Sequence, residues 1–261
     1  MIIPAPAARE HRLVVPGLMA LLVLLLLVVP FAALALGTDW RHFGLSDGDG
    51  AAIFTSLGLS LVSLAVVLVL GTPLAWWLAR ARFRAQLLIE ALVLLPLLTP
   101  PLALGIMLAA LYGPQSPVGH LMANIGISLT NSAPAFVVAQ VYGALPYYLV
   151  AARAAFEAVP RDYEQISLTL GKTRWQTFWR ISLPLARAGV AAGAALAWVR
   201  AMGEFGIVLI IAYFPQGIPV KLWVNLQDDG LQAVYPLLWC FFALALPLPL
   251  VLGLRSRRVL G

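Results

Sequence analysis

Charged side chains are scarce in this sequence. Asp, Glu, Lys and Arg make up only 11% of its 261 residues, whereas an ordinary soluble domain carries about 25%. Hydrophobic residues make up 62%, and the mean hydropathy is +0.92. This composition excludes a soluble enzyme, a disordered chain and a collagen-like chain, and it argues against nucleic-acid binding in spite of the net charge of +6. The sequence therefore predicts an integral membrane protein.

Cysteine and histidine are also nearly absent. Cys240 is the single cysteine, so no disulfide can form within the chain. The three histidines, His11, His42 and His120, are scattered and do not have the spacing of metal ligands. We therefore expect no metal site and no cofactor bound by this chain.

The sequence contains six long apolar segments. The alternating pattern of barrel strands is missing, so each segment is predicted to be a helix. The first could be a signal peptide, because Arg9 and Arg12 precede it, but it is about twice as long as the apolar part of such a peptide, and we expect it to be retained. The prediction is an all-α membrane protein with one transmembrane domain over 1–261, whose six spans cover 13–36, 54–79, 87–111, 133–156, 188–214 and 233–254.

The basic residues predict the orientation of these spans. If the chain crosses six times, fourteen of the 17 Lys and Arg residues lie on one side. The opposite side holds only Arg41 and Lys221, and Arg200 lies inside a span. By the positive-inside rule both termini are then cytoplasmic. The fourteen are Arg9, Arg12, Arg80, Arg82, Arg84, Arg153, Arg161, Lys172, Arg174, Arg180, Arg187, Arg255, Arg257 and Arg258.

The cytoplasmic segment 157–187 is long, charged and patterned like helices. Gly171-Lys172-Thr173 looks like the end of a phosphate-binding loop, but Ile166 stands where that motif needs a glycine, so nucleotide binding by this chain is not expected. Four apolar residues are spaced to form one helix face, which could lie on the membrane or contact a cytoplasmic partner. They are Trp175, Phe178, Trp179 and Ile181.

The same segment resembles the EAA loop of ABC-importer permeases, which reads Glu-Ala-Ala, three residues, Gly, nine residues, then Ile-x-Leu-Pro. Gln165, Ile166 and Ser167 replace Glu-Ala-Ala, and the acidic residue is shifted one place earlier, to Glu164. The resemblance implies a coupling helix between the fourth and fifth spans that seats in a groove of the ATPase. An amphipathic surface helix is the alternative. The resemblance assigns coupling to ATPase subunits to seven residues, which are Glu164, Gln165, Gly171, Arg174, Ile181, Leu183 and Pro184.

The fifth span carries two opposite charges in an apolar stretch. Arg200 and Glu204 are four residues apart, hence on one helix face. Two interpretations remain open. The two residues either form an ion pair whose sole role is to let the helix insert into the membrane, or they line or brace a transport pathway. Gly203 and Gly206 would let neighbouring backbones approach closely. The run Arg-x-x-Gly-Glu-Phe-Gly is similar to the molybdate and sulfate branch of the ABC-importer permeases.

The third span contains three prolines, Pro96, Pro100 and Pro101, which cannot sit in an unbroken helix. The break is either a structural kink or part of a gate. Glu90, which precedes it, is expected to pair with an arginine of 80–84. The outward segment 215–232 is either a docking site for a substrate-binding protein or a plain surface turn.

The resemblance covers about 51–254 and implies the permease subunit of a type I ABC importer, with molybdate or tungstate favoured over sulfate. It further implies two ATPase subunits that use ATP and Mg²⁺, a periplasmic binding protein, a second permease copy and a bacterial or archaeal inner membrane. No catalytic residue is expected. The competing classes are a proton-coupled secondary transporter, with Glu204 as proton carrier and Arg200 as anion site, and a membrane scaffold without transport.

Overall fold

The computed structural model describes residues 11–81, 84 and 86–260, and within these ranges the side chains of 17–253. This part of the chain is helical and contains no β-strand, which confirms the all-α class. In chain order the helices are α1 (His11–Gly37), α2 (Asp49–Arg80), α3 (Gln86–Leu98), α4 (Pro101–Tyr112), α5 (Pro117–Asn124), α6 (Ala133–Glu157), α7 (Arg161–Thr169), α8 (Arg174–Thr177), the π-helical turn η1 (Phe178–Ser182), α9 (Leu183–Met202), α10 (Gly206–Ile211), α11 (Ile218–Asp228), α12 (Leu231–Ala245) and α13 (Pro247–Leu260).

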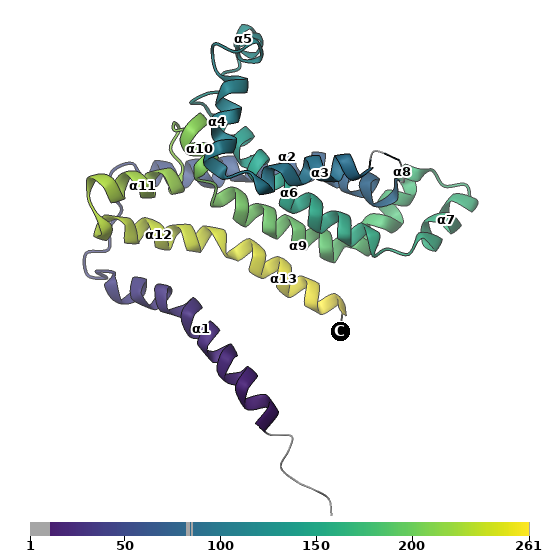
Figure 1. The fold of residues 1–261 in the computed structure, drawn as a ribbon, viewed down its shortest axis with the longest axis horizontal. Helices are drawn as coiled ribbons and strands as arrows, with labels where there is room; N and C mark the ends of the chain where they lie inside the picture. The colour runs from purple at the N-terminus through teal and green to yellow at the C-terminus, as the bar shows by residue number, and fades with distance from the viewer. Residues whose placement is uncertain (1–10, 82–83, 85, 261) are drawn as a thin grey trace, which may run out of the picture.

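Helices α2, α6 and α9 lie side by side and form the centre of the molecule (Figure 1). Small residues such as Gly193 and Ala197 line their contacts, because helices in lipid associate through close packing rather than hydrophobic burial. Tyr148 of α6 is fully buried, and its ring lies where a Cβ on Gly71 would come within 2.6 Å. Its hydroxyl group shares a hydrogen bond of 2.5 Å with Thr72. The central helices are therefore held in one register.

The third predicted span, 87–111, is broken at its prolines, as the sequence predicts. Helix α3 ends at Leu98 and α4 begins at Pro101, and the two are bent by 110°. Pro100 is extended because it precedes Pro101, and neither ring supplies the amide proton that a continuous helix needs. The predicted break is confirmed. Within the part of the chain that the structure describes, five segments are long and apolar enough to cross a membrane, and α3 with α4 makes a sixth only if the bent pair counts as one span.

The fifth predicted span, 188–214, is wrong as one helix. Helix α9 ends at Met202, and α10 starts after a break at Gly203–Phe205. At its other end α9 begins earlier than predicted, because η1 runs directly into it. The sixth span, 233–254, is divided between α12 and α13 at Leu246, next to Pro247. Helix α1, by contrast, stands apart from the bundle over most of its length (Figure 1).

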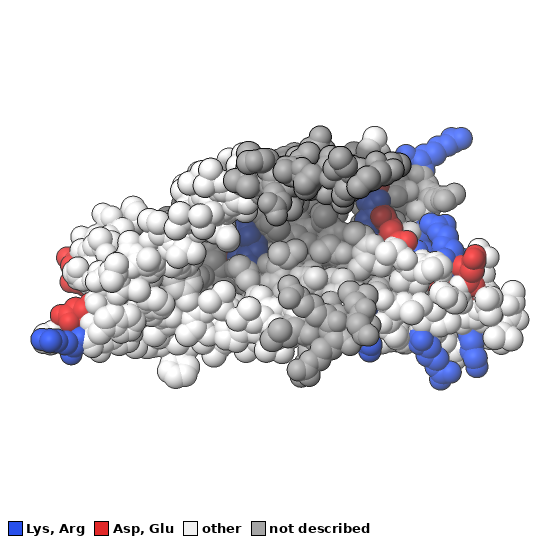
Figure 2. All heavy atoms as spheres, turned by 90° about the horizontal axis from the view of Figure 1, so that it is seen from below, with Lys and Arg blue, Asp and Glu red and all other residues white. Residues whose placement is uncertain are grey.

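In this view the described charged residues gather mainly at the two ends of the elongated molecule, and the described surface between them is nearly free of charge (Figure 2). A basic group also lies in a hollow near the middle of this face (Figure 2). The band between the ends suits the apolar part of a bilayer. The predicted orientation stays a prediction. Of the residues it used, Arg9 and Arg82 lie outside the described residues, as do the side chains of Arg12, Arg255, Arg257 and Arg258.

The segment 215–232, which is predicted to face outward, is not merely a turn, because most of it forms α11. Two buried polar contacts fasten this helix to α2. The Ile218 amide donates to Ser56 Oγ at 2.7 Å, and Asn225 Nδ2 donates to Asp49 Oδ1 at 2.9 Å. Asp49 and Asn225 are nearly inaccessible, so their hydrogen bond fixes α11 against the start of α2.

Candidate functional site: a broken helix and its groove

The break after α9 is built around Glu204, whose side chain is buried. One carboxylate oxygen accepts a hydrogen bond of 2.9 Å from the amide of Ile207, in the first turn of α10. The other pairs with the guanidinium group of Arg200, one turn earlier on α9. A carboxylate suits this position because the first amides of a helix lack partners within the helix. Arg200 and Glu204 thus join the two halves of the fifth span across the break.

Two glycines make room for the break. A Cβ on Gly143 of α6 would lie 2.6 Å from the second carboxylate oxygen of Glu204. A Cβ on Gly206 would lie 2.6 Å from Cβ of Pro101, at the start of α4. Gly143 therefore admits the carboxylate, and Gly206 brings the two broken spans together.

Helix α4, which follows the break in the third span, packs on α10, which follows the break in the fifth span. Leu104 and Leu108 of α4 are buried in one cluster with Ile207 and Ile211 of α10. Of the predicted gate residues, Pro101 and Gly206 therefore meet at this contact. Pro96 lies within α3, on the other side of the 110° bend. The three prolines thus do not form one wall with the charged pair.

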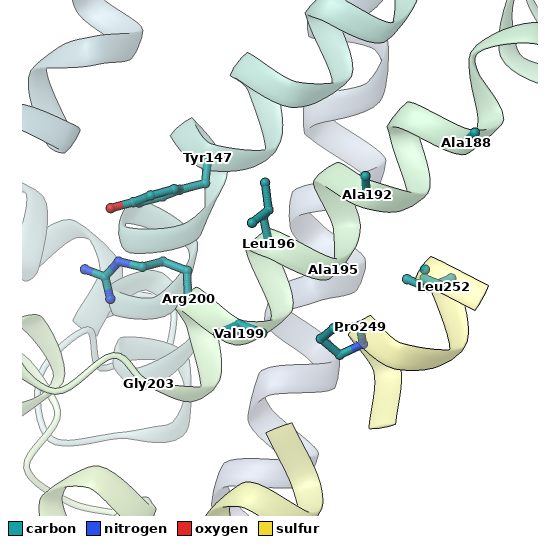
Figure 3. Close-up of a pocket in the computed structure, with 11 residues that line it drawn as sticks. Tyr147, Ala188, Ala192, Ala195, Leu196, Val199, Arg200, Gly203, Pro249 and Leu252 are labelled. Carbon is teal, nitrogen blue, oxygen red and sulfur yellow. The ribbon is translucent and has the colours of Figure 1, made fainter. Parts of the chain in front are cut away.

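A groove of about 720 Å³ opens beside the break, between α6, α9 and α13. Arg200 is the one charged residue among the described residues that line it, and Gly203 is also part of its wall. The Arg200 side chain is 24% exposed, whereas that of Glu204 is 0% exposed. The guanidinium carbon lies 5.8 Å from the ring centre of Tyr147, and the two side chains extend in the same direction (Figure 3). In Figure 3 both side chains extend away from Ala188, Ala192 and Leu252, so they lie at one end of the groove. Arg200 is thus the partly exposed member of the pair and forms part of the groove wall. The remaining lining residues are Ala188, Ala192, Ala195, Leu196, Val199, Pro249, Leu252 and Gly253.

The segment after α6 turns sharply at Gly171. Its φ of +78° is a conformation that glycine adopts readily, and it lets α7 and α8 fold against each other. Ser167 and Thr177 share a buried hydrogen bond of 2.9 Å across this turn. Three residues of the predicted apolar face form one aromatic cluster, because the ring centres of Trp175, Phe178 and Trp179 lie 5.2 to 5.6 Å from one another. Phe178 points inward against Trp76 and Phe156, whereas Trp175 and Trp179 remain more than half exposed.

Glu164 points into the protein rather than outward. Its carboxylate accepts two hydrogen bonds from Arg80, at the end of α2, with lengths of 2.8 and 2.9 Å. It also accepts one of 2.6 Å from the hydroxyl group of Ser182, at the start of the fifth span. The Arg80 and Glu164 side chains are only 14% and 13% exposed. Glu164 thus fastens the predicted coupling segment to two core helices.

The other predicted coupling residues fall into separate groups. Gln165 and Arg174 line a groove of about 610 Å³ with Arg80 and Glu164. Ile181 and Pro184 line a second groove, of about 540 Å³, on the side of Lys172. Leu183 packs against the central core.

The sequence predicts that Glu90 pairs with an arginine of 80–84, but among the described residues its ion partner lies elsewhere, and Arg82 is outside them. Glu90 forms an ion pair of 2.8 Å with Arg153 of α6, which also binds Glu157 at 2.7 Å. Helix α3 packs along α6, and this contact places Glu90 beside that arginine rather than beside the end of α2.

The molecule is a bundle of long apolar helices in which two spans are broken. At the break after α9, one basic side chain, Arg200, lies beside a groove. This is the architecture of a membrane permease. Residues 71–259 match the family described as binding-protein-dependent transport system inner membrane component. The chain belongs to this family.

Individual proteins agree with this assignment. The chain is 38% identical over 223 residues to the probable molybdenum ABC transporter permease protein of Haloferax volcanii, with 84% of this chain and 81% of that one covered. It is 32% identical over 201 residues to the molybdate/tungstate transport system permease protein WtpB of Thermococcus kodakarensis, with 77% and 76% covered. A crystal structure of a bacterial alginate ABC transporter, in complex with an alginate pentasaccharide-bound periplasmic protein, contains a chain with a TM-score of 0.76 and 18% identity over 96% of each chain. That last likeness concerns the fold alone.

Gly143→Ala tests how tightly the break is packed. The added methyl group would contact the Glu204 carboxylate, so we expect a loss of about 1–3 kcal/mol in stability. Thermal unfolding of the purified protein in detergent, followed by tryptophan fluorescence, measures it. Gly58→Ala is the matched control, because no atom lies within 4 Å of a Cβ at that position of α2. Equal midpoints for both variants would contradict the assigned role of Gly143.

Proposed function

We propose that this chain is the permease subunit of an ATP-driven importer that moves molybdate or tungstate into the cytoplasm by alternating access. Similar permeases are named for molybdenum, molybdate or tungstate transport, which supports this choice of anion. The observation that carries the proposal is the asymmetric charge pair at the groove. The exposed end is Arg200 and the buried end is Glu204.

This arrangement suits the passage of a tetrahedral oxyanion. A guanidinium group donates several hydrogen bonds in a planar fork, which matches the oxygens of such an anion. An unpaired arginine in an apolar groove would hold a dianion too firmly for release. The carboxylate of Glu204 is buried and does not reach the groove itself. It still reduces the attraction of Arg200 for an anion, because charges interact more strongly where water is excluded. Transport needs binding that is favourable and also brief.

The partners follow from the same reading. The segment 157–187 would couple two ATPase subunits, which bind ATP and Mg²⁺, to a pair of permease copies around a shared pathway. The residues proposed for ATPase contact are Gln165, Arg174, Ile181 and Pro184 of the two cytoplasmic grooves. Glu164 also lines the first groove, but it is proposed as an internal brace because it binds Arg80 and Ser182. A periplasmic binding protein would deliver the anion at the end that carries α11. Both termini are proposed to be cytoplasmic.

Sulfate is the second candidate substrate, and competition separates it from molybdate. The full complex, reconstituted in vesicles with its cognate binding protein, is expected to take up radioactive molybdate only with ATP. Tungstate should compete with molybdate at equal concentration. Sulfate should need an excess of about 100-fold, which corresponds to a difference in binding free energy of ~2.7 kcal/mol. Equal competition by sulfate would transfer the proposal to that anion. Uptake that continues without ATP and collapses with the proton gradient would instead favour a secondary transporter.

A further inference from the structure

Gln140 is a buried polar residue in the middle of α6 that no part of the proposed pathway uses. The residue is 1% exposed. The amide nitrogen donates two hydrogen bonds, one of 2.8 Å to Ser60 Oγ on α2 and one of 2.9 Å to the carbonyl oxygen of Ala201 on α9. One side chain thereby links all three central helices.

The Ala201 carbonyl lies at the point where α9 stops. The same oxygen accepts a hydrogen bond of 3.1 Å from the amide of Glu204, which closes the turn that follows the helix. The last carbonyls of a helix have no partners further along it, and in lipid no water can replace them. Gln140 therefore supplies a second donor to the carbonyl that shapes the break.

The position of Gln140 along α6 matches the other contacts of the break. Gly143, three residues later, admits the Glu204 carboxylate, and Tyr147, seven residues after Gln140, lies next to Arg200. Residues at this spacing share one face of a helix. One face of α6 thus contacts the break at its carbonyl, its carboxylate and its guanidinium group.

We infer that Gln140 is a positioning residue that fixes the end of α9, so that Arg200 presents its guanidinium group to the groove while Glu204 stays buried. Arg200 immediately precedes Ala201, so movement of the Ala201 carbonyl would turn the last helical turn and the Arg200 side chain with it. This inference rests on the proposed role of the groove. Gln140 itself lies away from the groove and acts through Ala201.

Charge-selective labelling measures this position without any transport. Leu196 lines the groove one turn before Arg200 and is 53% exposed. In the assembled transporter that carries Cys240→Ser and Leu196→Cys, we expect anionic methanethiosulfonate to react faster than the cationic reagent, relative to their rates with a free thiol. Adding Arg200→Ala should reduce this ratio about tenfold, which is the effect of one nearby charge in a partly hydrated site. Adding Gln140→Met, which keeps the size but cannot donate, should remove most of the same preference.

Two further variants control this experiment. Ser63→Ala removes a buried hydroxyl group whose hydrogen bond stays within α2, to the Leu59 carbonyl at 2.8 Å, and it should leave the ratio unchanged. Ser60→Ala removes one of the two acceptors of the Gln140 amide and should give an intermediate ratio. This variant also tests the inference if Gln140→Met does not yield folded protein. A ratio that falls with Arg200→Ala but not with Gln140→Met or Ser60→Ala would overturn the inference and leave the proposed function intact. Absence of anion uptake by the unmodified transporter would overturn the function, while the labelling would still report on Gln140.

Discussion

Arg200→Ala is expected to reduce ATP-driven anion uptake by about 10- to 100-fold, because a hydrogen bond to a charged group contributes about 1.5–3 kcal/mol. The same change should also destabilise the permease. Glu204 would remain buried without its ion partner, and an unpaired buried carboxylate costs about 3–5 kcal/mol. Uptake alone therefore cannot separate a role in transport from a role in folding.

The double variant Arg200→Ala with Glu204→Gln separates the two. A neutral amide can be buried without a counter-ion, and it can still accept from the Ile207 amide, so thermal stability should return towards that of the unmodified protein. Uptake should stay low, because the groove has lost its cation. Recovery of both stability and uptake would show that the pair serves only to insert the helix. The measurements are unfolding midpoints in detergent and initial uptake rates at equal amounts of transporter.

Much of the fold could be predicted from the sequence, because lipid imposes strong rules on composition. The number of apolar segments, the break at Pro100 and the turn at Gly171 all follow from hydrophobic length or from backbone chemistry. The break after Met202 could not be located in this way. Gly203 and Glu204 are compatible with a continuous helix, and the interruption depends on partners in α6 that are distant in the sequence.

The candidate site could be predicted only in part, for a similar reason. The spacing of four residues indicates the pairing of Arg200 with Glu204, but nothing local indicates which of the two is exposed. The Gly143 contact and the two Gln140 hydrogen bonds were missed. A usable signal was present, since Gln140, Gly143 and Tyr147 place a polar, a small and an aromatic residue on one face of an apolar helix. The pairing of Glu164 with Arg80 joins residues 84 positions apart and had no local signal.

Glu164→Ala should uncouple ATP hydrolysis from uptake. The carboxylate binds Arg80 and Ser182 together, so it ties the coupling segment to α2 and to the start of the fifth span. Without it, movement of the segment would no longer be passed directly to the helix that carries Arg200. We expect uptake to fall about tenfold while ATP hydrolysis continues, because a hydrogen bond to a charged group contributes about 1.5–3 kcal/mol and this pair is only partly buried.

Three variants make this prediction specific. Glu157→Gln removes a carboxylate that is 46% exposed and also pairs with an arginine, and it should have little effect on uptake. Arg174→Glu changes the exposed groove and should instead reduce co-purification of the ATPase subunits, whereas Glu164→Ala should leave co-purification unchanged. The exchange Arg80→Glu with Glu164→Arg should recover part of the uptake, since the ion pair can re-form in reverse. Loss of ATPase association in Glu164→Ala would place this carboxylate at the partner surface and contradict its role as an internal link.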